Sequence, residues 1–294
     1  MKPAAFEYVR PTTVADAIAT LVAYHGEAKV IAGGQSLVPV MNFRLLAPAA
    51  LVDINGIAGL DFITETAEGG LRIGALVRHY RLMTAPAVRV RFPVLAEAMR
   101  HVAHFAIRNR GTIGGSLSHA DPAAELPMMA VLLDATFRVV GPSGMRDVAA
   151  ADFFQGALAT ALAKDELLTE VLLPPRACTG WAFHEFAQRA GDYALAAVGV
   201  TLTTIDGRAA DVRLAVMGVG ETPLRIAAAE AALNGHPIDA ERIAAAVAAV
   251  RAAVTPSNDL HGSAEYRRHL VGGLVGRALE DAWGRGQHQS QEPA

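Results

Sequence analysis

Cysteine is almost absent from this sequence, because its 294 residues include only Cys178. One thiol cannot build a disulfide framework, and it cannot hold an iron–sulfur cluster, which takes about four thiolates. The N-terminal stretch MKPAAFEYVR has no apolar signal core, and no uninterrupted apolar run reaches the roughly 18 residues of a membrane span. We therefore expect a cytoplasmic protein in a reducing compartment.

Positive charge is not in excess either. The net charge is -3 and the isoelectric point is near 6.4, which argues against a basic face for nucleic acid. A hydrophobic fraction of 52% with 19% charged residues is typical of a globular protein with a large core. Since a domain usually takes roughly 100 to 200 residues, the length predicts two or three packed units.

Common nucleotide-binding motifs are also missing. No GxGxxG follows a strand, which disfavours a Rossmann domain for a nicotinamide cofactor. No GxxxxGK[ST] occurs, so nucleoside triphosphate hydrolysis has no local support. Any nucleotide site must therefore use a different kind of loop.

Hydrophobic periodicity predicts three regions, at 1–56, 57–175 and 176–294. In the first, Thr13 should cap a helix that stops at Gly26. The expected strands, in chain order, are 6–9, 29–32, 51–54, 71–74, 137–140, 167–173, 181–186, 196–204 and 212–219. Helices are expected between the fourth strand and about residue 100, and then at 223–233, 240–254 and 264–283. The stretch 108–127 reads as a polar, glycine-rich loop, and the last ten residues as a frayed end.

The segment IAGGQSLVPVMNF, at 31–43, places two glycines directly after an expected strand. Glycine allows backbone N–H groups to close on an anion, usually a phosphate, that a Cβ would keep away. A tight strand-to-helix turn would use the same residues. TIGGSL, at 112–117, repeats this chemistry about eighty positions later. Two such loops that face each other can enclose a pyrophosphate, although two unrelated turns would give the same pattern.

Together, five ordered motifs resemble the FAD-binding subunits of molybdenum hydroxylases. The first two are AGGQSLVPVMNFR and TIGGSLSHADPAAELP, and the others are RAGDYALAAVGVTL, GVGETPLRIAAAE and DLHGSAEYRRHL. The chain is similar over nearly its full length to the medium subunits of carbon monoxide dehydrogenase and of bacterial xanthine and nicotine dehydrogenases. The resemblance implies an α+β fold of the vanillyl-alcohol oxidase type. Two subdomains would hold FAD, followed by a C-terminal domain of antiparallel sheet and helices.

The resemblance also implies which residues contact FAD. The first pyrophosphate loop would be Ala32, Gly33, Gly34, Gln35, Ser36 and Leu37. The second would be Thr112, Gly114, Gly115 and Ser116, with Asp121 and Glu125 on the sugar and adenosine side. The flavin ring would meet Leu167 or Leu168, His184, Asp192 and Tyr193. The residues themselves allow other roles, because Asp121 before Pro122 can cap a helix and Tyr193 can be a core aromatic.

The chain departs from the family pattern at two of these positions. Ser116 stands where many relatives have Asn, and its shorter side chain leaves room for a water molecule. His184 stands where relatives often have Lys in the strand facing the flavin. A histidine with the ordinary pKa of about 6.5 would stabilise an anionic reduced flavin only when protonated.

The function that the resemblance implies is electron transfer. A large partner subunit would oxidise the substrate at a molybdenum cofactor, and a small partner would pass electrons through two [2Fe–2S] clusters to FAD in this chain. The complex would be a dimer of such heterotrimers. Because the substrate lies in the large subunit, carbon monoxide, a purine, a pyridine or other heterocycle, and an acyl-CoA all stay open, as does the external acceptor.

Several other interpretations compete with this one. A hydrolase could use the hydroxyl, imidazole and carboxylate groups of 116–121, but neighbours in one loop rarely adopt triad geometry, and no GxSxG elbow occurs. His101 and His104 have helical spacing but no nearby third metal ligand. A non-catalytic nucleotide-binding protein, or an independent flavin oxidase of the same fold, would carry the same loops.

Overall fold

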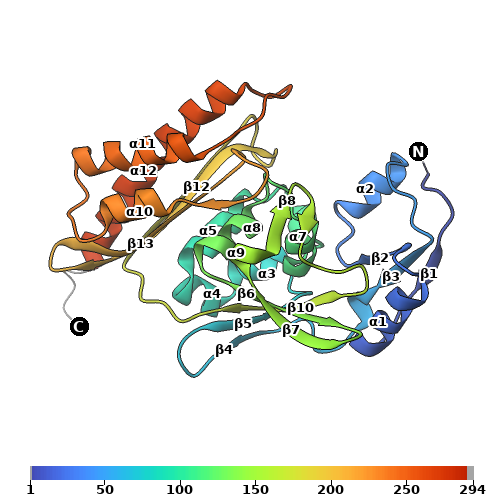
Figure 1. Cartoon of the computed structure of the whole chain (residues 1–294). Coiled ribbons are helices and arrows are strands. Elements are labelled where there is room, and N and C mark those ends of the chain that lie inside the picture. The colour runs from blue at the N-terminus through green and yellow to red at the C-terminus, as the bar shows by residue number, and fades with distance from the viewer. Residues whose placement is uncertain (1, 290–294) are drawn as a thin grey trace.

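The computed structural model describes residues 2–289, and its main sheets follow one another along the chain (Figure 1). The N-terminal part is a three-stranded parallel sheet in the order β1-β3-β2. Its elements are β1 (Glu7–Val9), α1 (Val14–Ala23), β2 (Ala28–Ile31), α2 (Leu37–Asn42), β3 (Ala50–Asp53) and the 3-10 helix η1 (Ile54–Gly56). Because β2 and β3 are parallel, the residues that follow both strands lie at the same edge of the sheet.

Helix α1 begins where the sequence predicts. The Thr13 Oγ1 accepts a hydrogen bond from the Asp16 N–H at 3.1 Å, which satisfies one of the free donors of the first turn. Ala17, Ile18 and Leu21 are the buried residues of this helix, and Ala17 and Leu21 belong to the small N-terminal core.

The central part is a five-stranded antiparallel sheet in the order β4-β5-β10-β6-β7. Its strands are β4 (Ile63–Glu65), β5 (Leu71–Gly74), β6 (Thr136–Gly141), β7 (Gly144–Ala149) and β10 (Leu167–Leu173), with a small hairpin of β8 (Phe154–Gly156) and β9 (Ala159–Thr160). Its helices are α3 (His79–Thr84), α4 (Pro86–Arg91), α5 (Pro93–His101), α6 (Phe105–Arg108), α7 (Ile113–His119), α8 (Glu125–Leu132) and α9 (Ala150–Phe153).

The C-terminal part is a four-stranded antiparallel sheet with long helices on one face (Figure 1). Its elements are β11 (Gly180–Ala187), β12 (Ala194–Ile205), β13 (Arg208–Met217), β14 (Leu224–Arg225), α10 (Ala227–Leu233), α11 (Ala240–Ala253) and α12 (Ala264–Gln289). The other face packs on the central helices, so all eight residues of α8 are buried. Apart from Glu125 at its start, this helix is apolar on every side, which fits the enclosed position.

Alternation along β11 separates the two faces of this sheet. Phe183 belongs to the core shared with the central helices, whereas Ala182 belongs to the core under α10 to α12. Because side chains of a strand alternate, Glu185 points toward the central part and His184 toward α12.

The described structure differs from the sequence prediction at several places. The strands β4, β7, β8, β9 and β14 are not among those expected. The stretch 108–127, expected to be a loop, contains all of α7 and the start of α8. Helix α12 continues through residue 289, into the expected frayed end, and residues 290–294 lie outside the described part. Within the described residues, no helix is both long and apolar enough to cross a membrane.

Candidate cofactor site

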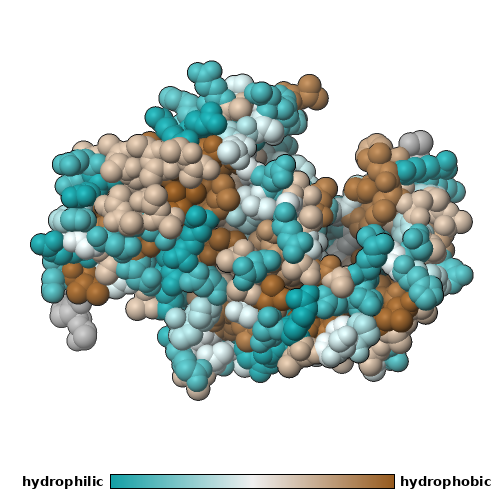
Figure 2. Space-filling view, viewed as in Figure 1, coloured by the Kyte–Doolittle hydropathy of each residue, from teal (hydrophilic) through white to brown (hydrophobic). Residues whose placement is uncertain are grey.

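The structure brings the two glycine motifs together between the N-terminal and central parts. A Cβ added to Gly33 would overlap the Arg110 carbonyl group and would lie 2.9 Å from the Gly111 Cα. Only glycine therefore permits this contact between the two backbones. The space-filling view is hollowed on the same side, between the N-terminal part and the rest of the molecule (Figure 2).

The first motif offers unpaired backbone donors. Gly34 has a φ of +71°, and its carbonyl accepts the Val38 N–H at 3.1 Å as α2 begins. The Gln35 side-chain amide turns back to the Gly33 carbonyl at 2.7 Å, which fixes the turn. Among residues 2–289, the backbone N–H groups of 33–36 have no hydrogen-bond acceptor. We call these four groups the N–H cradle, because consecutive free donors of this kind bind anions.

The glycines of the second motif have a different role. Gly114 donates its N–H to the Ala75 carbonyl at 2.9 Å, and an added Cβ would lie 2.6 Å from the Ala75 Cβ. The Gly115 N–H bonds the Thr112 Oγ1 at 3.1 Å, because Thr112 caps α7. Both N–H groups therefore already have hydrogen-bond acceptors within the protein. The second motif brings close packing and the hydroxyl groups of Thr112 and Ser116 to the site.

A buried histidine holds the second motif in place. The His79 ring contacts Gly111 so closely that a Cβ there would lie 2.8 Å from the His79 Cε1. Its Nε2 lies 3.0 Å from the Thr112 carbonyl oxygen, which requires the tautomer with hydrogen on Nε2. Burial lowers the pKa of His79 to about 4, so the ring is neutral at physiological pH.

Two polar residues at this junction, Asn55 and Arg78, are not predicted by the sequence analysis. Asn55 follows β3, and its amide donates to the Ala32 carbonyl at 2.8 Å. Arg78 precedes α3 and donates to the Asn55 Oδ1 at 2.7 Å. Asn55 could have been predicted from the sequence, because polar residues that follow neighbouring parallel strands meet at one edge of the sheet. No feature of the sequence predicts the role of Arg78.

Carboxyl groups gather at the other end of the site. Glu125, at the start of α8, is 9% exposed, and its pKa is raised to about 8 by burial and by the nearby charges of Glu185 and Asp121. Burial also raises the pKa of Glu185 to about 7, and its Oε2 has no hydrogen-bond partner among the described residues. Asp121 accepts the Ala123 N–H at 2.9 Å, so one of its oxygens shapes the turn before α8.

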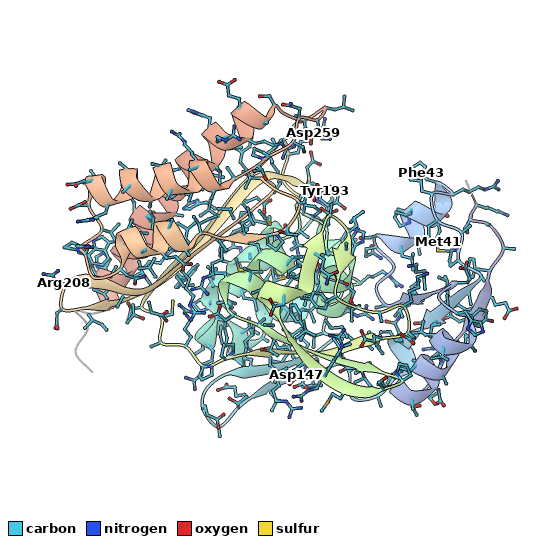
Figure 3. The ribbon with its side chains drawn as sticks, viewed as in Figure 1. Met41, Phe43, Asp147, Tyr193, Arg208 and Asp259 are labelled. Carbon is cyan, nitrogen blue, oxygen red and sulfur yellow. The ribbon has the colours of Figure 1, made fainter. Side chains whose placement is uncertain are left out.

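Asp192 and Tyr193 lie on an exposed loop between β11 and β12. Figure 3 shows Tyr193 on the C-terminal side of the hollow, opposite the part that carries Met41 and Phe43. Its side chain is 67% exposed, so it is not a core aromatic. Partial desolvation and the negative charges of Asp121 and Glu125 raise the pKa of Tyr193. Both carboxyl groups therefore lie near this loop.

The motifs GVGETPLRIAAAE and DLHGSAEYRRHL hold the chain next to the loop of Asp192 and Tyr193. Arg267, in α12, is buried and donates to the carbonyls of Leu195 and Gly218 at 2.8 and 3.1 Å. Its other terminal nitrogen bonds Asp259 at 2.6 Å. The Gly218 N–H in turn donates to the Pro122 carbonyl at 3.0 Å. These bonds fix the C-terminal part to the turn that carries Asp121.

Three of the expected contact residues point into other parts of the protein. His184 bonds Asp281 of α12 at 2.8 Å, on the sheet face away from Glu185. Leu167 is buried in the N-terminal core and Leu168 in the central core. Their positions in β10 explain this difference, because neighbouring residues of a strand face opposite sides.

Comparisons with known proteins agree with this architecture. Residues 4–176 match the family described as the FAD binding domain in molybdopterin dehydrogenase, and residues 181–282 match the CO dehydrogenase flavoprotein C-terminal domain. The chain is 42% identical to the nicotine 6-hydroxylase medium subunit of Paenarthrobacter nicotinovorans, over 97% of this chain and 100% of that one. It is 38% identical to the carbon monoxide dehydrogenase medium chain of Hydrogenophaga pseudoflava, over 97% and 99% of the two chains.

Solved structures show the same similarity. Carbon monoxide dehydrogenase from Hydrogenophaga pseudoflava contains a chain that superposes with a TM-score of 0.95 at 39% identity, covering 97% of this chain and 99% of that one. A chain of quinoline 2-oxidoreductase from Pseudomonas putida 86 gives a TM-score of 0.93 at 38% identity, with the same coverage.

Proposed function

Because this chain belongs to the FAD-binding medium subunits of molybdenum hydroxylases, we propose that it carries electrons from a partner's [2Fe–2S] clusters to an external acceptor. The N–H cradle is the observation that supports this proposal most strongly. It presents four free donors where two subdomains meet, and the glycine that makes the contact possible cannot carry a Cβ. Consecutive free, neutral donors of this kind fit the pyrophosphate of FAD.

The residues present fit the rest of the cofactor as well. The N–H groups of 33–36 would hold the pyrophosphate, and the hydroxyl groups of Thr112 and Ser116 would add donors from the second motif. Asp192 and Tyr193 would meet the flavin ring at the opposite end. When bound, flavin supplies the ability to accept electrons singly and to deliver them in pairs.

The carboxyl groups of Asp121, Glu125 and Glu185, which we call the carboxyl cluster, change the proposed position of two of these residues. Asp121 and Glu125 were expected on the adenosine side, but their charges act on Tyr193. If Tyr193 meets the flavin ring, these two carboxyl groups belong to the ring end of the site. Because the side chains of Leu167 and Leu168 pack in the two cores and His184 bonds Asp281, we propose no side-chain contact of these three residues with the cofactor.

The proposal includes two kinds of partner. The curated relatives are medium chains or subunits of multi-subunit enzymes, and this chain has one cysteine, too few for a cluster of its own. We therefore propose a large molybdopterin-binding subunit and a small [2Fe–2S] subunit, arranged as a dimer of heterotrimers in the cytoplasm. We also propose domain bounds of 1–56, 57–175 and 176–294, which follow the three sheets.

Copurification tests the electron-transfer role. The chain isolated from its native host should carry two partner chains, and one FAD, one molybdenum and four iron atoms per heterotrimer, as two [2Fe–2S] clusters require. Expressed alone, it should bind FAD but oxidise no hydroxylase substrate, because no molybdenum site is proposed in this chain. Substrate turnover by the isolated chain would instead support an independent flavin oxidase.

A second prediction concerns the aromatic ring of Tyr193. Tyr193→Ala should change the absorption spectrum of bound flavin or its reoxidation rate, with little effect on stability because the side chain is exposed. Tyr193→Phe keeps the ring and should resemble the unmodified protein in its spectrum. Tyr266→Ala, at a partly exposed position of α12, serves as the control. Unchanged spectra and rates in Tyr193→Ala would place this side chain away from the ring.

A further inference from the structure

A continuous set of hydrogen bonds joins the two subdomains behind the N–H cradle. It begins at Asp53, which ends β3 and is buried. The Asp53 carboxylate accepts the Asn55 N–H at 3.0 Å and the Asn55 Nδ2 at 2.6 Å, and its other oxygen accepts the Tyr8 hydroxyl. These bonds leave the Asn55 side chain with one fixed orientation.

From this fixed position Asn55 reaches both glycine motifs. Its Nδ2 also donates to the Ala32 carbonyl at 2.8 Å, directly before the first glycine pair. Its Oδ1 accepts the Arg78 Nη2 at 2.7 Å. The Arg78 Nη1 donates to the Arg110 carbonyl, the same group that Gly33 contacts. One amide and one guanidinium thus connect Ala32 to Arg110 across the subdomain boundary.

We propose that Asn55 and Arg78 are positioning residues for FAD, which set the separation of the two glycine motifs and thereby align the N–H cradle with the pyrophosphate. This inference rests on the proposed FAD function of the same site. Because the donors of a cradle must converge on one anion, a small opening between the motifs weakens all of their bonds together.

The chemistry of both side chains suits this bridge. An amide can donate from its nitrogen to one carbonyl while its oxygen accepts from a guanidinium. A guanidinium presents separate nitrogens in a fixed plane, so Arg78 can bond Asn55 and Arg110 at the same time. An ammonium group carries all of its donors on one nitrogen, so it lacks the two separated nitrogens that Arg78 uses for these acceptors.

The charge of Arg78 also favours an anion at this place. Its side chain is partly buried, and burial together with the neighbouring charge of Arg110 lowers the pKa of its guanidinium. Two like charges so close to the cradle repel each other, and a pyrophosphate bound beside them would relieve that repulsion. The positive charge of Arg78 and the free N–H donors of the cradle therefore both favour an anion at this place.

The test compares FAD dissociation constants of the full chain for Asn55→Asp, Arg78→Lys and Arg78→Ala. Asn55→Asp keeps an acceptor for Arg78 but removes the donor to Ala32. Each variant should weaken FAD binding by about 10-fold to 100-fold, the size expected for losing a hydrogen bond to a charged or buried group. The control is Arg81→Ala in α3, the helix that directly follows Arg78, which loses an exposed ion pair to Asp61 at 2.6 Å.

A second measurement separates positioning from general stability. The 31P spectrum of bound FAD reports the surroundings of the pyrophosphate, so it should shift in all three variants and stay unchanged in Arg81→Ala. Denaturant unfolding of the apoprotein measures stability independently. Weaker binding with an unshifted 31P spectrum, or unchanged dissociation constants, would overturn the inference. If the unmodified chain bound no FAD, the proposed function itself would fail, which is a different result.

Discussion

Replacing Gly33 with alanine should abolish stable FAD binding. The new Cβ would overlap the Arg110 carbonyl group, which belongs to the backbone and cannot move aside as a flexible side chain can. The two motifs would have to separate, and the N–H cradle would lose its alignment. Flavin absorbance retained after gel filtration measures the effect, and we expect it to fall to the background of a protein without cofactor.

Two other glycines serve as comparisons. Gly273, in α12, has open space where a Cβ would go, so Gly273→Ala should retain FAD and change stability by no more than about 1 kcal/mol. Gly114→Ala would overlap Ala75 in the core and should lower the free energy of unfolding even without FAD. Full retention of flavin by Gly33→Ala would show that contact between the motifs is not needed for the cofactor.

The sequence predicts that the two glycine motifs form one site, but it does not show which of them has free backbone donors. Both contain a glycine pair followed by hydroxyl groups, and both were expected to supply backbone donors. Whether an N–H is free depends on its partner, and the partner of Gly114 is the carbonyl of Ala75, almost forty residues earlier. That contact exists only after β5 and α7 have packed together.

The fold could be predicted best where hydrophobic periodicity is strong. Strand β10 has the bounds that the sequence predicts, 167–173, because a mainly apolar segment, interrupted only by Thr169 and Glu170, ends at two prolines. Helix α7 was missed because its glycines and serines have low helix propensity, and it depends on the Thr112 cap and on tertiary packing. The orientation of His184 could be predicted from the sequence, because side chains alternate along a strand and those of Phe183 and His184 therefore lie on opposite faces.

The carboxyl cluster could not be predicted, because its chemistry depends on burial. Glu125 follows a loop rich in polar and small residues, and nothing in that stretch shows that its side chain becomes enclosed. Glu185 comes from a strand sixty residues later. Only the packing of α8 against the C-terminal sheet brings the two groups together, and their raised pKa values follow from that enclosure.

This enclosure predicts that the apoprotein loses stability as pH rises. The folded state holds the proton of Glu125 up to a pKa of about 8, whereas the ordinary value is 4.5. Between these values the folded state binds more protons, so the free energy of unfolding falls with pH. His79, with a pKa lowered to about 4, has the opposite effect, but only below its ordinary value of 6.5. The window from pH 6.5 to 8 therefore isolates the carboxyl groups.

Glu125→Gln should flatten this dependence and make the apoprotein more stable at pH 8. The gain should be about 2 kcal/mol relative to pH 6.5, since a difference of one bound proton changes stability by about 1.4 kcal/mol per pH unit. Denaturant unfolding at several pH values measures it. Glu185→Gln should also flatten the curve, because burial raises the pKa of Glu185 and its charge raises the pKa of Glu125. Glu68→Gln, at an exposed position, should leave the curve unchanged. Identical pH profiles for Glu125→Gln and the unmodified chain would show that Glu125 is ionised at neutral pH and that water or a cation reaches it in the folded protein.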